Sequence, residues 1–108
     1  MNRSAKVYFH EVFAGVISET DMGYSFQYDK VYLDDTKAKP ISKTLPLQSK
    51  TYETRVLFPF FDGLIPEGWL LEVAEKNWKL SSKDRFGLLL MCCEDCIGAV
   101  SVINLIEK

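Results

Sequence analysis

The chain has 108 residues, of which 47% are apolar, 13% aromatic and 26% charged. This length and composition indicate one globular domain over residues 1–108 and exclude a disordered chain. Thirteen lysines and arginines against fifteen acids give a net charge of −2, and neither sign forms a long run, so we expect no direct contact with nucleic acid.

The first residues lack the apolar core of a secretion signal, and no stretch approaches the ~20 apolar residues that span a bilayer. Three cysteines, Cys92, Cys93 and Cys96, lie in one cluster. Because an odd number makes a poor disulfide framework, the cluster suits a reducing compartment. We therefore expect a cytoplasmic protein without a membrane segment.

Strand-like patterns come first along the chain. Residues 6–12 and 15–20 predict two strands joined at residues 13–15, and residues 24–28 predict a third strand. Tyr24, Phe26 and Tyr28 stand at period two, so one face of that strand is aromatic. We expect this face to pack in the core, because no lysine or arginine interleaves it to make a stacking platform for bases.

The next residues are less regular. Residues 31–33 extend the third strand or begin a fourth, and residues 34–43 hold the polar residues of a loop. Residues 45–47 can form only a short or edge strand, because Pro46 cannot donate to a ladder.

Two helices and a last strand complete the prediction. The first helix runs from Pro66 to about Trp78, with Trp69 about 130° from the centre of its apolar stripe. The second covers residues 86–93, after a capping box of Ser81 and Asp84. Residues 98–105 predict a closing strand that pairs with the early strands. The class is therefore α+β: a small antiparallel sheet, made of a meander plus a C-terminal strand, packed with two to three helices.

The residue types for common catalytic sites are sparse. No glycine-rich phosphate loop is present, and His10 is the only histidine, most simply a side chain on a strand surface. Asp34-Asp35 and Glu94-Asp95 are adjacent acids of the kind that turns usually place in solvent. We expect no cofactor, no metal and no catalytic residue.

Cys93 and Cys96 have the C-x-x-C spacing of a redox pair or half a zinc site. Their motif follows a predicted helix, whereas a thioredoxin-like motif follows a strand. Small buried or capping cysteines are the favoured interpretation, and a thiol-redox protein is the enzyme alternative.

Residues 58–69, here named the aromatic segment, pack four aromatic residues, two prolines and two glycines into twelve positions. Proline fixes φ and glycine releases it, so the segment holds a specific irregular shape while presenting apolar bulk. This combination is typical of a docking surface, and a tryptophan off its helix's core face resembles an interface anchor. The predicted partner-binding residues are Trp69, Phe58, Phe60, Phe61, Pro66, Glu67 and Gly68.

The string Phe60-Phe61-Asp62-Gly63-Leu64-Ile65-Pro66-Glu67-Gly68 resembles the FF-x-x-LLPEG element of the N-terminal subdomain of HipA-type toxin kinases. Further on, Asp95-Cys96-Ile97-Gly98-Ala99 is similar to the D-x-x-GA element of that family. Looser similarities are Gly15 in the first hairpin, Phe26 and Tyr28 in the third strand, and Ile41-Ser42 with Leu45-Pro46-Leu47. The resemblance covers residues 7–102 and implies the fold of that subdomain without the kinase body and its catalytic-loop and metal-binding aspartates.

A chain of this length also resembles the small HipS-type subunits of split HipBST toxin–antitoxin systems. There the kinase toxin, HipT, is a separate chain, and a HipB-like helix-turn-helix protein binds DNA. The resemblance implies a non-enzymatic antitoxin that binds and neutralises a HipT-like serine/threonine kinase, with Trp69 plugging or distorting its active site. A non-inhibitory subunit that bridges the kinase to the DNA-binding partner, and a truncated HipA, remain as alternatives.

Overall fold

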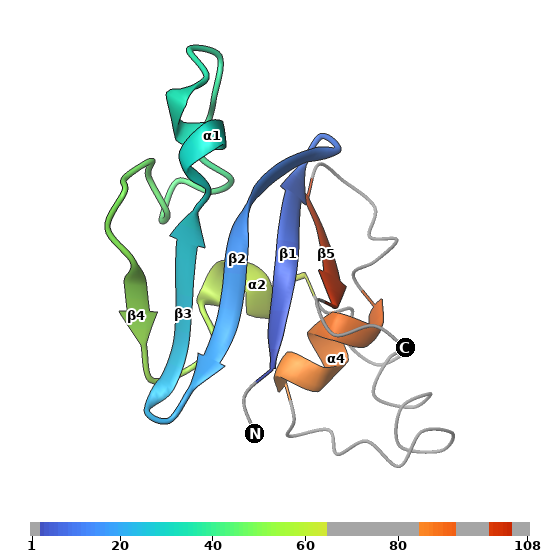
Figure 1. Ribbon diagram of the computed structural model, residues 1–108. Coiled ribbons are helices and arrows are strands. Elements are labelled where there is room, and N and C mark those ends of the chain that lie inside the picture. Colours follow the sequence, from blue (N-terminus) through green and yellow to red (C-terminus); the bar gives the residue numbers. More distant parts are fainter. Residues whose placement is uncertain (1–2, 65–84, 93–99, 105–108) are drawn as a thin grey trace.

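A computed structural model describes residues 3–64, 85–92 and 100–104 of the chain. Its elements are, in chain order, β1 (Ser4–Phe9), β2 (Val12–Thr20), β3 (Gly23–Tyr28), α1 (Lys30–Asp34), β4 (Tyr52–Thr54), α2 (Pro59–Asp62), α4 (Arg85–Cys92) and β5 (Val100–Asn104). The strands form one antiparallel sheet in the order β4-β3-β2-β1-β5 (Figure 1). The predicted α+β class, with a meander closed by a C-terminal strand, is confirmed.

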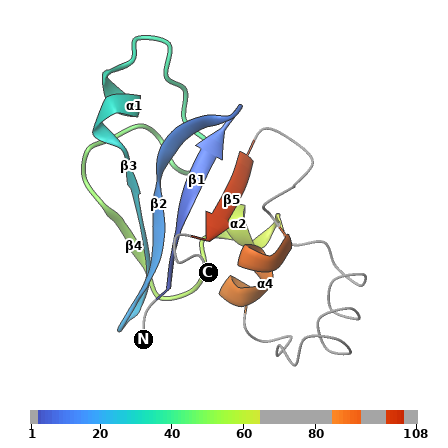
Figure 2. The same cartoon turned by 45° about the vertical axis from the view of Figure 1, so that its right-hand side comes forward.

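The aromatic face of β3 packs in the core, as its period-two pattern predicts. Phe26 is fully buried, with its ring centroid 5.7 Å from that of Phe61 on α2. The ring centroid of Tyr24 lies 5.8 Å from that of Phe86 on α4. Both helices therefore cover the same face of the sheet (Figure 2).

Apolar side chains of the neighbouring strands complete this core. Ala5 and Val7 on β1 are fully buried, and Val7 pairs with the fully buried Val102 of β5. Each such valine or leucine-sized side chain contributes roughly 1.5–3 kcal/mol when it leaves water. The predicted pairing of the last strand with the early strands is confirmed.

The position of the first hairpin differs from the prediction. The turn consists of His10 and Glu11, with φ values of 51° and 68°, and Phe9 pairs with Val12. Two residues with positive φ are typical of a type I′ turn, which matches the twist of the flanking strands but is usually marked by Asn-Gly or Asp-Gly. The predicted turn at residues 13–15 is therefore wrong. The actual turn residues, His10 and Glu11, lack the glycine or asparagine by which such a turn is usually recognised in a sequence.

Gly15, whose presence suggested that turn, lies inside β2 and serves a close approach instead. A Cβ atom there would lie 2.3 Å from the carbonyl oxygen of Gln27 on β3. The register between β1 and β2 also shifts next to this position, from Val7 opposite Gly15 to Tyr8 opposite Phe13. Glycine thus marks a bulged region of tight strand packing, which is a known alternative to a turn.

Residues 31–33 are helical, so the prediction of a strand there is wrong. They belong to α1, whose N-cap is Asp29; its carboxylate accepts hydrogen bonds from the backbone N–H groups of Val31 (3.0 Å) and Tyr32 (3.4 Å). A capping aspartate satisfies two donors that a new helix would leave unpaired. The local cap therefore outweighs the strand propensity of valine and tyrosine.

The segment after α1 is a long loop, as predicted, but its strand content differs. Residues 45–47 form no strand, and Leu45 makes only an isolated bridge to Ser42. The strand at this edge of the sheet is β4, which pairs Tyr52 with Phe26 and Thr54 with Tyr24.

The helical predictions are met in part. Helix α4 confirms the body of the second helix, while its predicted cap and the helix expected at 66–78 lie outside the described residues. Helix α2 occurs where no helix was predicted and begins with Pro59 in its first turn. None of the described helices is long and apolar enough to cross a membrane.

Candidate functional site

The described part of the aromatic segment is anchored in the core. Phe61 is fully buried and Phe58 is 7% exposed, and their ring centroids lie 6.1 Å apart. Phe58 is the N-cap residue of α2 and Phe61 lies within that helix, and both side chains belong to the buried core. Phe58 and Phe61 therefore attach the segment to the sheet and have little surface left for a partner.

Besides the exposed Pro59, Phe60 and Leu64 are the described apolar residues of this segment that keep part of their surface in solvent. Both are half-buried, and Phe60 packs its ring against that of Phe61 in an edge-to-face contact, with centroids 5.2 Å apart. The remaining predicted partner-binding residues, Pro66, Glu67, Gly68 and Trp69, lie outside the described residues. The structure thus brings Phe58, Phe60 and Phe61 together and leaves Phe60 as the accessible member.

An ion pair links α2 to α4 beside these aromatic residues. Arg85 Nε donates to Asp62 Oδ1 at 2.6 Å, and both side chains are about one-third exposed or more. A pair in this position contributes between zero and about 1 kcal/mol. The pair joins the last residue of α2 to the first residue of α4.

Among the described residues, the predicted chemical candidates do not come together in one site. His10 lies in the β1–β2 turn, exposed, with its ring edge against Phe9, and not on a strand surface. Asp35 accepts a hydrogen bond from the backbone N–H of Lys37, as expected of a turn acid. Cys93 and Cys96 lie outside the described residues, and within the described ranges no three His, Cys, Asp or Glu side chains gather where they could hold a metal.

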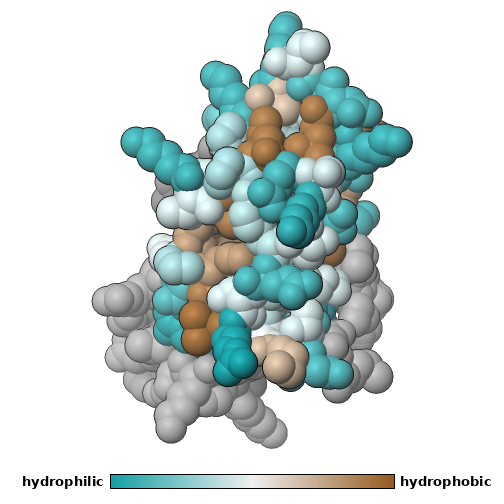
Figure 3. All heavy atoms as spheres, turned by 90° about the vertical axis from the view of Figure 1, so that its left-hand side faces the viewer, coloured by the Kyte–Doolittle hydropathy of each residue, from teal (hydrophilic) through white to brown (hydrophobic). Residues whose placement is uncertain are grey.

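Sequence reasoning missed four exposed apolar side chains. Their exposed fractions are 78% for Val31, 72% for Met22, 67% for Val56 and 51% for Val12. Seen from the side of the β4 edge, the surface is mostly hydrophilic, with apolar patches between the polar side chains (Figure 3). Asp29, a residue type that favours helix N-caps, lies two positions before Val31 and is the signal in the sequence that could have placed Val31 outside a strand.

Three tyrosine hydroxyls hold the loop between α1 and β4 on the sheet. Tyr28 donates to the carbonyl of Leu45 and accepts from the backbone N–H of Ile41 at 3.1 Å. Tyr32 donates to the carbonyl of Lys39 and Tyr52 to that of Pro46, each at 2.5 Å. The loop therefore has a defined path.

Burial raises the pKa of Tyr28 from 10.0 to about 12, while the hydrogen bond from Ile41 acts in the opposite direction. Burial also raises the pKa of Tyr52. Both hydroxyls stay protonated at neutral pH and remain donors to the loop carbonyls.

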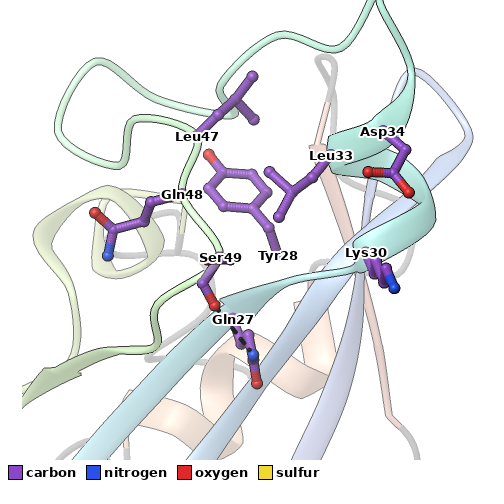
Figure 4. Close-up of a pocket in the computed structure, with 8 residues that line it drawn as sticks. All are labelled: Gln27, Tyr28, Lys30, Leu33, Asp34, Leu47, Gln48 and Ser49. Atoms are coloured by element: carbon purple, nitrogen blue, oxygen red, sulfur yellow. Dashed lines mark hydrogen bonds between the residues drawn. The ribbon is translucent and has the colours of Figure 1, made fainter.

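A hollow of about 600 Å³ lies between α1 and this loop (Figure 4). Leu33 and Leu47 flank the ring of Tyr28, which forms the apolar floor. Gln27 donates from its side-chain amide to the carbonyl of Ser49 at 3.3 Å, closing the lower side. With apolar groups at its floor and polar ones at its rim, the hollow can accept an apolar side chain of a partner.

Comparisons with known proteins agree with this architecture. The family model of the HipA N-terminal domain matches residues 5–103. In the solved structures, the N-terminal domain of HipA toxin superimposes with a TM-score of 0.75 at 29% sequence identity, over 98% of this chain and 95% of that one.

Two curated relatives are each 32% identical to the chain. An uncharacterized protein of Haemophilus influenzae aligns over 93% of this chain and 91% of its own length. The putative kinase Y4mE of Sinorhizobium fredii aligns over 72% of this chain but only 19% of its own length, so the chain corresponds to a small part of that protein. Together with the shared sheet and the family match over nearly its whole length, these relatives show that the chain belongs to the HipA N-terminal domain family.

Proposed function

We propose that this chain is an antitoxin that binds and neutralises a separate HipA-like serine/threonine kinase toxin, in a three-component system with a helix-turn-helix DNA-binding partner. One pair of observations carries the proposal: the domain matches 19% of a putative kinase in one relative and 91% of a small protein in another. The same domain thus occurs both as part of a longer protein named a kinase and as nearly the whole of a small protein.

The physical argument is one of complementary surfaces. A domain that folds beside a larger body within one chain buries a face against that body, and the separated domain keeps that face for binding. The half-buried Phe60 and Leu64 lie on the described part of the aromatic segment, and Trp69 follows in sequence. In the proposed complex these residues contact the kinase over ~800 Å² per partner, and the domain acts by binding and not by a reaction of its own.

The decisive experiment is a phosphorylation assay of the kinase encoded beside this chain, with and without the purified full-length chain. We expect the chain to bind and to inhibit. Trp69→Ala should weaken binding by ~2 kcal/mol or more, about thirtyfold, as truncation of a central anchor does. Phe60→Ala should weaken it by a smaller factor, and both variants should keep the wild-type circular dichroism spectrum.

Val31→Ala is the matched control, because Val31 is also an exposed apolar residue but lies on α1, away from α2 (Figure 1). It should inhibit like the wild type, as should the Cys93→Ser/Cys96→Ser variant if no thiol chemistry is involved. A bound kinase that stays fully active would instead identify a non-inhibitory structural subunit. Absence of any complex would reject both the antitoxin and the structural-subunit interpretations.

A further inference from the structure

The end of the molecule that carries α1 has a charge opposite to that of the whole chain. Residues 30–50, here named the lysine-rich end, contain five lysines and two aspartates, against a chain with a net charge of −2. All five lysines are exposed, and none forms an ion pair within the described residues; they are Lys30, Lys37, Lys39, Lys43 and Lys50. Such an asymmetry indicates a surface that attracts an anionic partner.

The fold holds these lysines on a defined backbone. Helix α1 and the following loop project together beyond the end of β3 (Figure 1). The hydroxyls of Tyr32 and Tyr28 bind the carbonyls of Lys39 and Leu45, and the rings of the two tyrosines stack with planes 4° apart. Because the loop path is already ordered, binding a partner there costs little backbone entropy.

Beside this loop lies a second hollow, of about 780 Å³, between the β1–β2 turn and the residues that follow α1. Phe9, Val12, Tyr32 and Ala38 give it apolar walls, and Val12 is 51% exposed. Its polar lining residues are His10, Asp35, Thr36, Lys37 and Lys39.

The charged side chains that line this hollow are Lys37 and Lys39 against Asp35, which leaves one net positive charge. The carboxylate of Asp35 already accepts a hydrogen bond from the backbone N–H of Lys37, whereas the ammonium groups of Lys37 and Lys39 have no carboxylate partner within the described part of the chain. The hollow thus combines two available cations with an apolar wall.

The opposite rim is a strained turn. His10 and Glu11 both have positive φ, in a conformation that costs about 1–2 kcal/mol for each residue that is not glycine. The turn places His10 at the rim of the hollow, and backbone outliers of this kind concentrate at functional sites.

From these observations we propose that the lysine-rich end is a second docking surface, which binds an acidic segment of a protein partner by pairing Lys37 and Lys39 with carboxylates and seating one apolar side chain against Val12. Nucleic acid would use the lysines but gain little from the apolar wall, since most of its backbone contacts are hydrogen bonds to phosphate and sugar oxygens. The surface shares no residue with the aromatic segment, and the inference does not rest on the proposed antitoxin function.

Fluorescence anisotropy with the full-length chain tests the proposal. The probe is a labelled peptide with one leucine flanked by glutamates; a matched peptide has alanine in place of the leucine. We expect the leucine peptide to bind several-fold more tightly, with an affinity that falls as salt is added. Equal binding of the two peptides, or binding of neither, would overturn the proposal.

Variants locate the site. Lys37→Ala/Lys39→Ala should weaken binding of the leucine peptide at least about tenfold, and Val12→Ser should remove its advantage over the alanine peptide. Lys6→Ala, at an exposed position in β1, removes a lysine outside the lysine-rich end and should change little.

If a DNA duplex binds more tightly than the peptide and Val12→Ser has no effect, the surface serves nucleic acid and the proposal is wrong. Trp69→Ala should leave peptide binding intact, so this result is independent of the kinase assay.

Discussion

The hydroxyl of Tyr28 donates a hydrogen bond to the carbonyl of Leu45, and this contact joins the end of β3 to the middle of the loop that follows α1. The same oxygen accepts from the backbone N–H of Ile41. Both Ile41 and Leu45 are buried, at 5% and 2% exposure. One side chain therefore satisfies two buried backbone groups on a segment without regular secondary structure.

Tyr28→Phe should consequently be destabilising despite its small change in volume. It leaves the Leu45 carbonyl and the Ile41 amide without their partner, which costs about 1–3 kcal/mol for a buried unpaired group. Chemical denaturation measures the loss, and hydrogen exchange at the Ile41 amide should become faster. Tyr32→Phe, which removes one part-buried bond to Lys39, is the control and should cost less; an equal or larger cost would contradict this account.

The raised pKa of Tyr28 predicts a loss of stability in alkali. Its pKa is about 12 in the folded protein against 10.0 for an ordinary tyrosine. Below pH 10 the hydroxyl is protonated in both states; between pH 10 and 12 the unfolded chain releases the proton and the folded one keeps it, so the free energy of unfolding falls.

Unfolding curves from pH 9 to about pH 12 would test this, with Tyr28→Phe as the reference because it cannot titrate at this position. The stability advantage of the wild type over Tyr28→Phe should shrink across this window. A difference that stays constant would show that Tyr28 ionises at its ordinary pKa.

Several elements could be read from the sequence because local pattern and packing agree. Tyr24, Phe26 and Tyr28 alternate on a strand whose aromatic face is the core face, and the apolar run in α4 is helical with Phe86 and Leu89 fully buried. The two motifs around Pro66 and Gly98 also predicted the domain family that the comparisons show. Here propensity and burial favour the same structure.

Other elements depended on contacts that no pattern expresses. The β1–β2 turn uses left-handed His10 and Glu11, which sequence rules assign to glycine or asparagine. In the candidate site, composition groups Phe58 with Phe60. The structure separates them, because Phe58 is buried and Phe60 is only half-buried. The first hollow beside α1 combines residues from both sides of a long loop, and the second combines the β1–β2 turn with residues that follow α1, so only the folded chain reveals them.

The strained turn yields a prediction of its own. Replacing His10-Glu11 by Asn-Gly should raise the free energy of unfolding by about 1–2 kcal/mol, because both new residues tolerate positive φ. Thermal unfolding provides the measurement. Met22→Gly, in the β2–β3 turn where φ is not positive, is the control and should be neutral or destabilising; a gain there of the same size would attribute the effect to glycine in general.

Phe60 and Phe61 are neighbours in sequence with opposite consequences on truncation. Phe61 is fully buried between α2 and β3, so Phe61→Ala should cost about 3–5 kcal/mol, a large share of the 5–15 kcal/mol that stabilises a typical domain. Phe60 is half-buried, so Phe60→Ala should cost distinctly less. Chemical denaturation of both variants separates the two cases.

The same two variants then refine the binding experiment. A Phe61→Ala chain that fails to inhibit the kinase reports lost folding, whereas a folded Phe60→Ala chain with weakened inhibition reports a lost contact. If Phe60→Ala inhibits like the wild type while remaining folded, then α2 supports the docking surface without contributing to it. Within the aromatic segment, the kinase contact would in that case be made by Leu64 and the residues that follow it, which include Trp69.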